Sequence, residues 1–411
     1  MKNNFSRSRS ARFRLCAAAA MLVISAPATA GCGSESPATQ DRTVDPTSLD
    51  TGSYATKPQH VTAADPVAQG RITEALRLGN ALPLPSEVDS ALADNAHGTH
   101  VLLNGYSYEG YITADHFDAD TPGFISGFAT AAKTKPNTGL YSLDNAVMIF
   151  DNEADAANAA VALARTGFAL KEAERAEVVA LQPTKNPNHR LLWDSKKQLL
   201  ASWYPVGRFV IFTMVHNSEN AYLQIYWNVA AEPAPLVLAD KAIDVTTDRL
   251  KSFSATPADK IADLPIDPDG MLELTLPRPP GDRTADAFTG TLDQHGALHD
   301  ADDPNASRAR FDTVGVDIVS YGAGQLVRTR DDQAAQTYLE TAFADRFHHR
   351  IDSPQGLPDA SCVKYHGPDL TQFPFVCHVR FGRYVASEWS QQQQDAYQRI
   401  SAQYAILANK K

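Results

Sequence analysis

The fold is decided by residues 359–390, DASCVKYHGPDLTQFPFVCHVRFGRYVASEWS, which contain the two cysteines that lie outside the N-terminal leader region. Apolar and polar residues alternate over 361–366 and 375–379, and this period of two is typical of β-strands. Residues 380–384 supply a glycine-containing turn before a further strand-like run at 385–389. The stretch therefore predicts a strand followed by a β-hairpin.

A disulfide between Cys362 and Cys377 would join two neighbouring strands of this sheet. On the loop-entropy account, closing a loop this short stabilises the fold by about 3 kcal/mol. The alternative is a pair of reduced cysteines buried in the core. The disulfide is favoured because the leader described next directs the chain to an oxidising compartment.

Residues 1–31 form an export signal. They hold five basic residues and no acidic one, and an apolar run at 15–24 is followed by a segment of small residues. The apolar run is too short to span a membrane as a mature helix. We therefore expect an exported protein that faces outside the cytoplasm.

Two cleavage sites compete at the end of the leader. Ala28-Thr-Ala30 fits an ordinary signal-peptidase site, whereas Thr29-Ala-Gly-Cys32 resembles a bacterial lipobox, although a leucine is usual where Thr29 stands. The count of cysteines favours the lipobox, because an unlipidated Cys32 would be an exposed odd thiol. We predict a lipid (palmitate) attached to Cys32, anchoring the protein to the cell membrane, and a flexible tether over residues 32–48, which are small, polar and proline-containing.

Composition excludes some classes of partner. Removal of the leader leaves 32 basic residues against 48 acidic ones, a formal charge of −16, so nucleic acid is not an expected partner. No later apolar run reaches the length of a transmembrane helix, so membrane attachment is expected to rest on Cys32. The remaining length, roughly 360 residues, suits two domains.

The body shows the same pattern twice. An aspartate before a helix and the next Gly-Arg-aromatic-Val turn are 56 residues apart in the first half (151 to 207) and 51 in the second (331 to 382). We predict an α+β protein of two similar domains, each an antiparallel sheet with helices packed on it, at 49–256 and 269–411, with a linker at 257–268. An internal duplication explains the pattern, and two unrelated α+β domains remain the alternative. Tyr222–Val229 is predicted as a strand of the first domain.

Several stretches occur together with the leader, namely LDTGSYATKP (49–58), RITEALRLGNALPLPSEV (71–88), HGALH (295–299), FVCHVRFGRYVASEWS (375–390) and QRISAQYAILAN (398–409). In this combination the chain resembles a family of lipoproteins from mycobacteria, nocardiae and their relatives. The resemblance implies two domains and a cell-envelope location. It supplies no catalytic residues.

Several patterns approach known sites without meeting their requirements. Ser107 misses the G-x-S-x-G nucleophile elbow by one residue. The pairs His97/His100 and His295/His299 have metal-ligand spacing but lie in apparent loops, which favours surface histidines, and His348-His349 adds no more. The acidic loops 118–123 and 300–305 lack the EF-hand ligand ladder, and no nucleotide-binding glycine pattern is present. No catalytic residue, metal site or cofactor is predicted.

Arg208 and Arg383 occupy matching positions in the two Gly-Arg-aromatic turns. Each could contact an anionic ligand, and the alternative is a solvated arginine at a hairpin turn.

The sequence favours a non-enzymatic binding or interaction module of the cell envelope, with an envelope lipid, glycan or protein as partner. The alternatives are a hydrolase acting on envelope lipids or glycans, and a lipid carrier. A deep apolar cavity would favour the carrier, and a polar cleft with a buried Ser/His/Asp or carboxylate cluster would favour the enzyme. We also expect the two halves to pack together, with the strand aromatics in the core or at this seam.

Overall fold

The computed structural model describes residues 44–96, 98–108, 116–135, 140–167, 177–281, 288–341, 346–368 and 372–410. Residues 44–411 form one compact unit, separate from residues 1–43. The predicted export signal, Cys32 and most of the predicted tether therefore lie outside the described residues.

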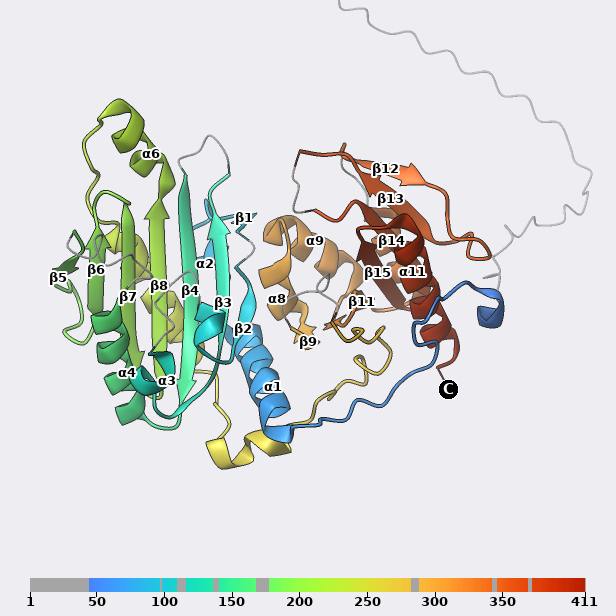
Figure 1. Cartoon of the computed structure of the whole chain (residues 1–411), viewed down its shortest axis with the longest axis horizontal. Helices are drawn as coiled ribbons and strands as arrows, with labels where there is room; N and C mark the ends of the chain where they lie inside the picture. The colour runs from blue at the N-terminus through green and yellow to red at the C-terminus, as the bar shows by residue number, and fades with distance from the viewer. Residues whose placement is uncertain are drawn as a thin grey trace, which may run out of the picture. The chain divides into compact units, whose positions relative to one another are not determined.

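The first half is built on an antiparallel sheet with the strand order β1-β3-β4-β8-β7-β6-β5, and β2 also pairs with β3 (Figure 1). The strands are β1 (Asp94–Asn95), β2 (His100–Leu102), β3 (Phe124–Lys133), β4 (Tyr141–Phe150), β5 (Val179–Leu181), β6 (Arg190–Asp194), β7 (Leu199–Val206) and β8 (Phe209–Asn217).

Helices cover both faces of this sheet. On one face α4 packs its small residues Ala156, Ala159 and Ala160 against Trp203 and Phe212. The other face carries α1, α2 and α7, whose apolar residues join side chains of alternate strand positions. The helices of this half, short ones included, are α1 (Pro66–Ala81), α2 (Pro85–Val88), η2 (Gly105–Tyr108), α3 (Phe117–Asp120), α4 (Glu153–Thr166), α6 (Ser218–Trp227) and α7 (Leu236–Leu250).

The second half has an antiparallel sheet with the order β9-β10-β11-β15-β14-β13-β12. Its strands are β9 (Gly290–Asp293), β10 (Ile318–Tyr321), β11 (Gln325–Arg328), β12 (His348–Ile351), β13 (Ser361–Tyr365), β14 (Phe375–Phe381) and β15 (Tyr384–Ser390). Its helices are α8 (Gln294–Ala297), η4 (Leu298–Asp300), α9 (Pro304–Val314), α10 (Asp332–Thr341) and α11 (Gln393–Ala408). Helix α11 packs on one face, and α9 and α10 lie on the other. The predicted α+β architecture of two antiparallel sheets with helices is confirmed.

The two sheets repeat one topology. β3-β4-α4-β5-β6-β7-β8-α7 in the first half corresponds, element for element and in the same sheet order, to β10-β11-α10-β12-β13-β14-β15-α11 in the second. The hairpin glycines match as well, since Gly207 and Gly382 both have a φ of 53°, a conformation that glycine adopts without a steric penalty. The backbone oxygens of Arg208 and Arg383 accept equivalent hydrogen bonds, from the amides of Phe150 and Thr329. These correspondences favour a duplication over two unrelated domains.

Cys362 and Cys377 form a disulfide that joins β13 to β14. The two residues stand directly opposite each other in the strand register, and both are buried against α11. The strand and hairpin predicted from residues 359–390 are also present, as β13, β14 and β15.

Three segments differ from the sequence-based prediction. Residues 222–229 are not a strand, because Ser218–Trp227 forms helix α6, which is capped by the Asn217 side chain. Residues 44–48 include the 3-10 helix η1 (Pro46–Ser48), and Val44 packs against the core beneath α11. Within the predicted linker, Ala258–Asp263 forms the 3-10 helix η3, whose Ile261 is buried against α1.

The halves meet in one continuous apolar cluster around α1. Leu76 and Leu78 of α1 join Phe128 and Val147 from the first sheet and Leu292 from the second. Trp203 and Phe212, in contrast, belong to the core under α4 and not to this seam. The expected packing of the halves is therefore present, although each sheet already has helices on both faces.

A buried histidine spans the seam and corrects the expectation of surface histidines at 295–299. Nε2 of His299 lies 3.1 Å from the carbonyl oxygen of Gly79 and must donate to it, so Nδ1 accepts from the Thr130 hydroxyl at 2.9 Å. Burial lowers the pKa of His299 to about 3. Nε2 of His295 contacts the carbonyl oxygen of Leu82, 2.7 Å away, which adds a second bond across the seam.

We expect the disulfide between Cys362 and Cys377 to stabilise the fold. Replacing Cys362 and Cys377 together by alanine should lower the free energy of unfolding by about 3 kcal/mol in urea titrations. Adding a reductant should shift the wild-type midpoint and leave the double variant unchanged. Free, alkylatable thiols at both positions in native material would contradict this expectation.

Stability should also depend on pH through His299. As the pH falls below 6.5, the unfolded imidazole binds a proton before the folded one, whose pKa is about 3, so stability is lost over this range. His299→Gln keeps one donor and one acceptor but does not titrate. Between pH 7 and pH 5 the wild type should lose about 2 kcal/mol more than this variant in urea unfolding. Exposed His60 provides the control, since His60→Gln should retain the wild-type loss.

Candidate functional site

A polar cleft of about 410 Å³ lies beside α7 in the first half. We call it the α7 cleft. One wall comes from the segment between β5 and β6 and from Tyr204 of β7, and α7 supplies the other. The residues that line it are Lys185, Asn186, His189, Tyr204, Asp240, Ile243, Asp244, Thr247 and Asp248.

Helix α7 presents a row of carboxylates to this cleft. Asp240, Asp244 and Asp248 follow one another at intervals of four and thus lie on one face of the helix. Its apolar face, which includes Ala239 and Ala242, packs on the sheet. Like charges at this spacing repel each other and destabilise a helix by a few tenths of a kcal/mol per pair. The wall is therefore rich in acceptors and carries negative charge.

Two contacts from the opposite wall relieve part of this repulsion. The hydroxyl of Thr184 donates to Oδ2 of Asp240 at 2.7 Å, and Nζ of Lys185 lies 2.8 Å from Oδ2 of Asp244. Both groups of the second contact are more than half exposed, so that ion pair is a weak one. Asp248 forms an ion pair with Lys251 on its own helix. Each of the three carboxylates has few hydrogen-bonding or charged partners. Several of their acceptor positions are therefore open.

His189 is the most unusual group in the cleft. Its side chain is only 3% exposed, and Nδ1 lies 3.8 Å from Oδ1 of Asp240. Its Nε2 is buried and makes no hydrogen bond. Burial lowers the pKa of His189, and the Asp240 carboxylate opposes this effect only in part. We assign the neutral form with its proton on Nδ1, toward the carboxylate, so that Nε2 is left as a hydrogen-bond acceptor.

Two hydroxyl groups complete the lining. The side-chain oxygen of Thr247 is buried and also makes no hydrogen bond, whereas the Tyr204 hydroxyl accepts from Nδ2 of Asn186 at 2.8 Å. Buried polar groups without partners are uncommon in folded proteins. Two of them in one cleft, Nε2 of His189 and Oγ1 of Thr247, indicate a place where a ligand or water forms hydrogen bonds.

The cleft lacks the parts of two common catalytic sites. No serine or cysteine is among its lining residues. Over the described ranges of the chain, no cluster of three or more His, Cys, Asp or Glu side chains is arranged to hold a metal ion.

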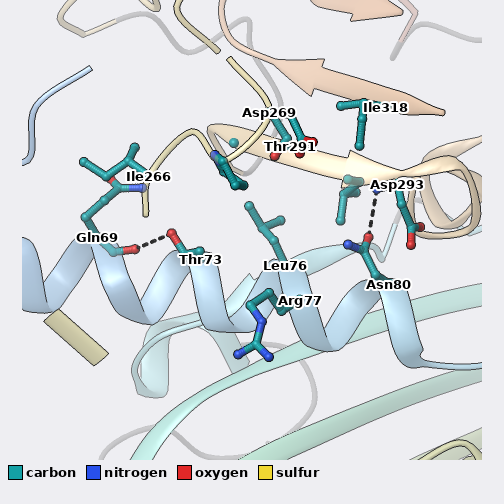
Figure 2. Close-up of a pocket in the computed structure, with 13 residues that line it drawn as sticks. Gln69, Thr73, Leu76, Arg77, Asn80, Ile266, Asp269, Thr291, Asp293 and Ile318 are labelled. Atoms are coloured by element: carbon teal, nitrogen blue, oxygen red, sulfur yellow. Dashed lines mark hydrogen bonds between the residues drawn. The ribbon is translucent and has the colours of Figure 1, made fainter. Parts of the chain in front are cut away.

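A smaller pocket lies at the seam, between α1 and β9. Figure 2 shows Leu76 projecting from α1 toward β9, while Asn80 accepts a hydrogen bond from the backbone N–H of Asp293 at 3.1 Å. Its volume is about 80 Å³, room for a few water molecules. We interpret it as a packing gap between the halves.

The structure assigns structural contacts to several residues that the sequence singled out. Both ring nitrogens of His100 face carbonyl oxygens, those of Gly98 and Ser107, and His97 lies outside the described residues. Ser107 is part of the 3-10 helix η2 and not of a nucleophile elbow. His348 and His349 belong to β12, where their rings lie close to those of Tyr365 and His366.

The acidic loops likewise serve the fold. Asp120 accepts from the Thr166 hydroxyl at 2.5 Å, and Asp303 caps α9 through the amides of Asn305 and Ala306. These carboxylates fix helix ends, as side chains of this type commonly do.

Arg208 and Arg383 do not line the α7 cleft. Nε of Arg208 donates to the carbonyl oxygen of Phe150 at 2.6 Å, and the guanidinium of Arg383 lies 5.8 Å from the ring centre of Tyr384. Their predicted role in ligand contact stays a prediction.

The sequence analysis missed the α7 cleft altogether. A signal was present in DKAIDVTTD (240–248), where an acidic residue recurs at every fourth position. The role of His189 could not be predicted from its sequence neighbours, because its partner Asp240 is 51 residues away in the sequence.

Comparison with known families covers most of the compact unit. The N-terminal domain of DUF7373, a domain of unknown function, matches residues 61–266, and the C-terminal domain of DUF7373 matches residues 271–410. The chain belongs to the DUF7373 family. The α7 cleft lies within the N-terminal domain of this family.

The other comparisons add little. None of the curated proteins matches the chain significantly. A solved structure, the extracellular domain of PknH from Mycobacterium tuberculosis, is 11% identical, covers 46% of this chain and 100% of its own length, and superposes with a TM-score of 0.27. A score this low carries no argument about fold or function.

Proposed function

We propose that this DUF7373 protein is a non-enzymatic binding module of the cell envelope, anchored by a lipid on Cys32, and that the α7 cleft is its ligand site. The observation that carries the proposal is the unpartnered Nε2 of His189, a buried acceptor on a residue that lines a cleft with three aspartates. Proteins rarely leave such an atom without a partner unless a ligand or water completes it.

The cleft defines the chemistry of the ligand. Its free positions are mostly acceptors, namely the carboxylate oxygens of α7 and Nε2 of His189. Three aspartates against Lys185 leave it negatively charged, because burial keeps His189 neutral. A ligand with several O–H or N–H donors and a positive charge therefore fits, and an amino sugar is the simplest envelope compound with this chemistry.

One observation favours the hydrolase alternative. His189 beside Asp240 has the arrangement of a general base oriented by a carboxylate, and such a base could activate a water molecule. The lining contains no serine or cysteine, so a hydrolase of the serine or cysteine type has no nucleophile in this cleft.

The lipid-carrier alternative has less support. The α7 cleft is polar, and the seam pocket is much smaller than the roughly 300 Å³ at which ligand sites begin.

Location is the second part of the proposal. In the described part of the chain no helix is both long and apolar enough to cross a membrane. The proposed attachment therefore rests on the leader and on Cys32, twelve residues before the compact unit begins at Val44.

Glucosamine should bind in the α7 cleft, and glucose should bind more weakly because it has no ammonium group to pair with the aspartates. Binding should raise the melting temperature, and the imidazole nitrogen resonances of His189 should shift in NMR titrations. Asp240→Asn and His189→Ala should each weaken glucosamine binding about tenfold or more, the cost of losing a hydrogen bond to a charged or buried group.

Asp263→Asn is the matched control, since Asp263 is an exposed aspartate outside the cleft. Preference for an anionic probe such as glucuronate would contradict the proposed ligand chemistry. Turnover of glucosaminide or ester substrates that His189→Ala abolishes would instead establish the hydrolase.

Cys32→Ala should move the protein from the membrane fraction to the medium in the natural host or a bacterial lipoprotein expression strain. Metabolic labelling with an alkynyl fatty acid should mark the wild type and not the variant. A wild-type protein that is soluble and begins at Gly31 would show cleavage after Ala30, and with it the lipid anchor would be excluded.

A further inference from the structure

Helix α6 is an addition to the repeated fold. It connects β8 to α7, whereas the equivalent strand and helix of the second half, β15 and α11, are joined directly across residues 391–392. Its one fully buried residue is Asn220. The repeat therefore folds without such a helix, and the helix requires another explanation.

The polar side of α6 faces the protein. The Asn217 side chain caps the helix, and Oδ1 of Asn220 accepts from the backbone N–H of Glu232 at 3.2 Å. Nε2 of Gln224 donates to the carbonyl oxygen of Ser195 at 3.1 Å. These bonds fix the orientation of the helix on the body.

The apolar side of α6 faces solvent. Tyr222, Ile225, Tyr226 and Trp227 are 55%, 72%, 67% and 71% exposed, and Val229 extends the row just after the helix. The rings of Tyr222 and Tyr226 contact each other at a tilt of 37°, with their centres 4.5 Å apart. A surface helix normally buries its apolar face in the core, so α6 has the reverse arrangement. Contiguous exposed apolar groups of this kind mark interaction surfaces.

We propose that these residues form a docking surface for the headgroup region of a lipid bilayer. The surface is separate from the α7 cleft and does not rest on the ligand proposed for it. We call Tyr222, Ile225, Tyr226, Trp227 and Val229 the α6 ridge.

The composition and shape of the α6 ridge favour a membrane as its occupant. Tyrosine and tryptophan concentrate at the bilayer interface, where the ring contacts the acyl boundary and the O–H or N–H stays hydrated. A single helix lying on the membrane buries its apolar face to a depth of about 5–10 Å. Tyr222, Ile225 and Tyr226 lie on one helix face, and Trp227 is exposed beside it at the end of the helix. The ridge is not a groove, so it can enter a fluid layer without a complementary partner surface.

Charges beside the ridge are of both signs. Glu219 is exposed at the start of α6, and Lys196, which pairs with Glu177, lies in the turn that Gln224 contacts. Binding should therefore not require anionic lipid.

The test uses residues 44–411, which form one compact unit and lack Cys32. This protein should co-sediment with phosphatidylcholine vesicles, with little dependence on salt. Trp227 fluorescence should shift to the blue on binding, since Trp193 and Trp203 are already buried and Trp389 is partly buried. The shift should be lost in Trp227→Gln. Replacing Tyr222, Ile225, Tyr226 and Trp227 together by glutamine should reduce partitioning about tenfold or more.

Matched controls are Val67→Gln, Val161→Gln and Val237→Gln, which remove apolar side chains that are 54%, 50% and 83% exposed elsewhere. They should bind vesicles as the wild type does. If the quadruple variant is poorly folded by circular dichroism, the single variants Ile225→Gln and Trp227→Gln should each show a smaller loss.

Three results would overturn the proposal. The first is no binding to vesicles of phosphatidylcholine or of phosphatidylcholine mixed with phosphatidylglycerol. The second is binding to the anionic mixture alone, with the same binding in the quadruple variant. That result would attribute the binding to lysine side chains and not to the α6 ridge. The third is a concentration-dependent dimer in sedimentation that the quadruple variant abolishes while vesicles have no effect, which would make a second copy of the chain the occupant.

Discussion

Burial of α1 between the two sheets is the constraint on which the rest of the structure depends. Its apolar residues contribute to a core that draws on β3 and β4 from one side and on β9 from the other. Its Glu74, fully buried, accepts hydrogen bonds from the backbone and side chain of Thr256 and pairs with Arg77, so that the start of the connection between the halves is tied to this helix. A buried carboxylate is tolerated only when it is paired and hydrogen-bonded in this way. Neither half therefore has a complete core without the other.

The duplication gives an internal comparison that separates fold from function. Helix α11 is buried over most of its length, because the segment that begins at Val44 and residues 271–276 cover the side turned away from its sheet. The equivalent helix α7 has no such cover and displays its aspartates in a cleft. Helix α6 likewise exists in the first repeat only, over the described residues. Both candidate surfaces thus lie where the first repeat departs from the second, outside the elements that the shared topology needs.

Local sequence patterns predicted much of the fold and little of the candidate sites. Alternation over 361–366 and 375–379 is a property of neighbouring residues, so β13, β14 and a disulfide between neighbouring strands could be inferred. The register that places Cys362 opposite Cys377 is known only from the structure. Helix α6 was predicted as a strand because aromatic residues favour strands. The spacing i, i+3, i+4, i+7, which is typical of a helix, is nevertheless present in Tyr222, Ile225, Tyr226 and Val229. The seam role of His299 and the pairing of His189 with Asp240 depend on residues far apart in the chain, which no local pattern reveals.

The N-terminal segment of the compact unit packs against the last helix of the chain. The hydroxyl of Tyr54 donates to Asp395 at 2.6 Å, and Nδ2 of Asn409 donates to the carbonyl oxygen of Thr56 at 2.9 Å, across 341 and 353 residues of sequence. A chain that is translocated from its N-terminus exposes Tyr54 early and α11 last. In such a chain the segment around Tyr54 cannot form its native contacts until α11 has been translocated. Native packing can therefore be completed only after translocation has ended. Contacts of such long range slow folding, so the export proposed for this chain would require protection from aggregation during that interval.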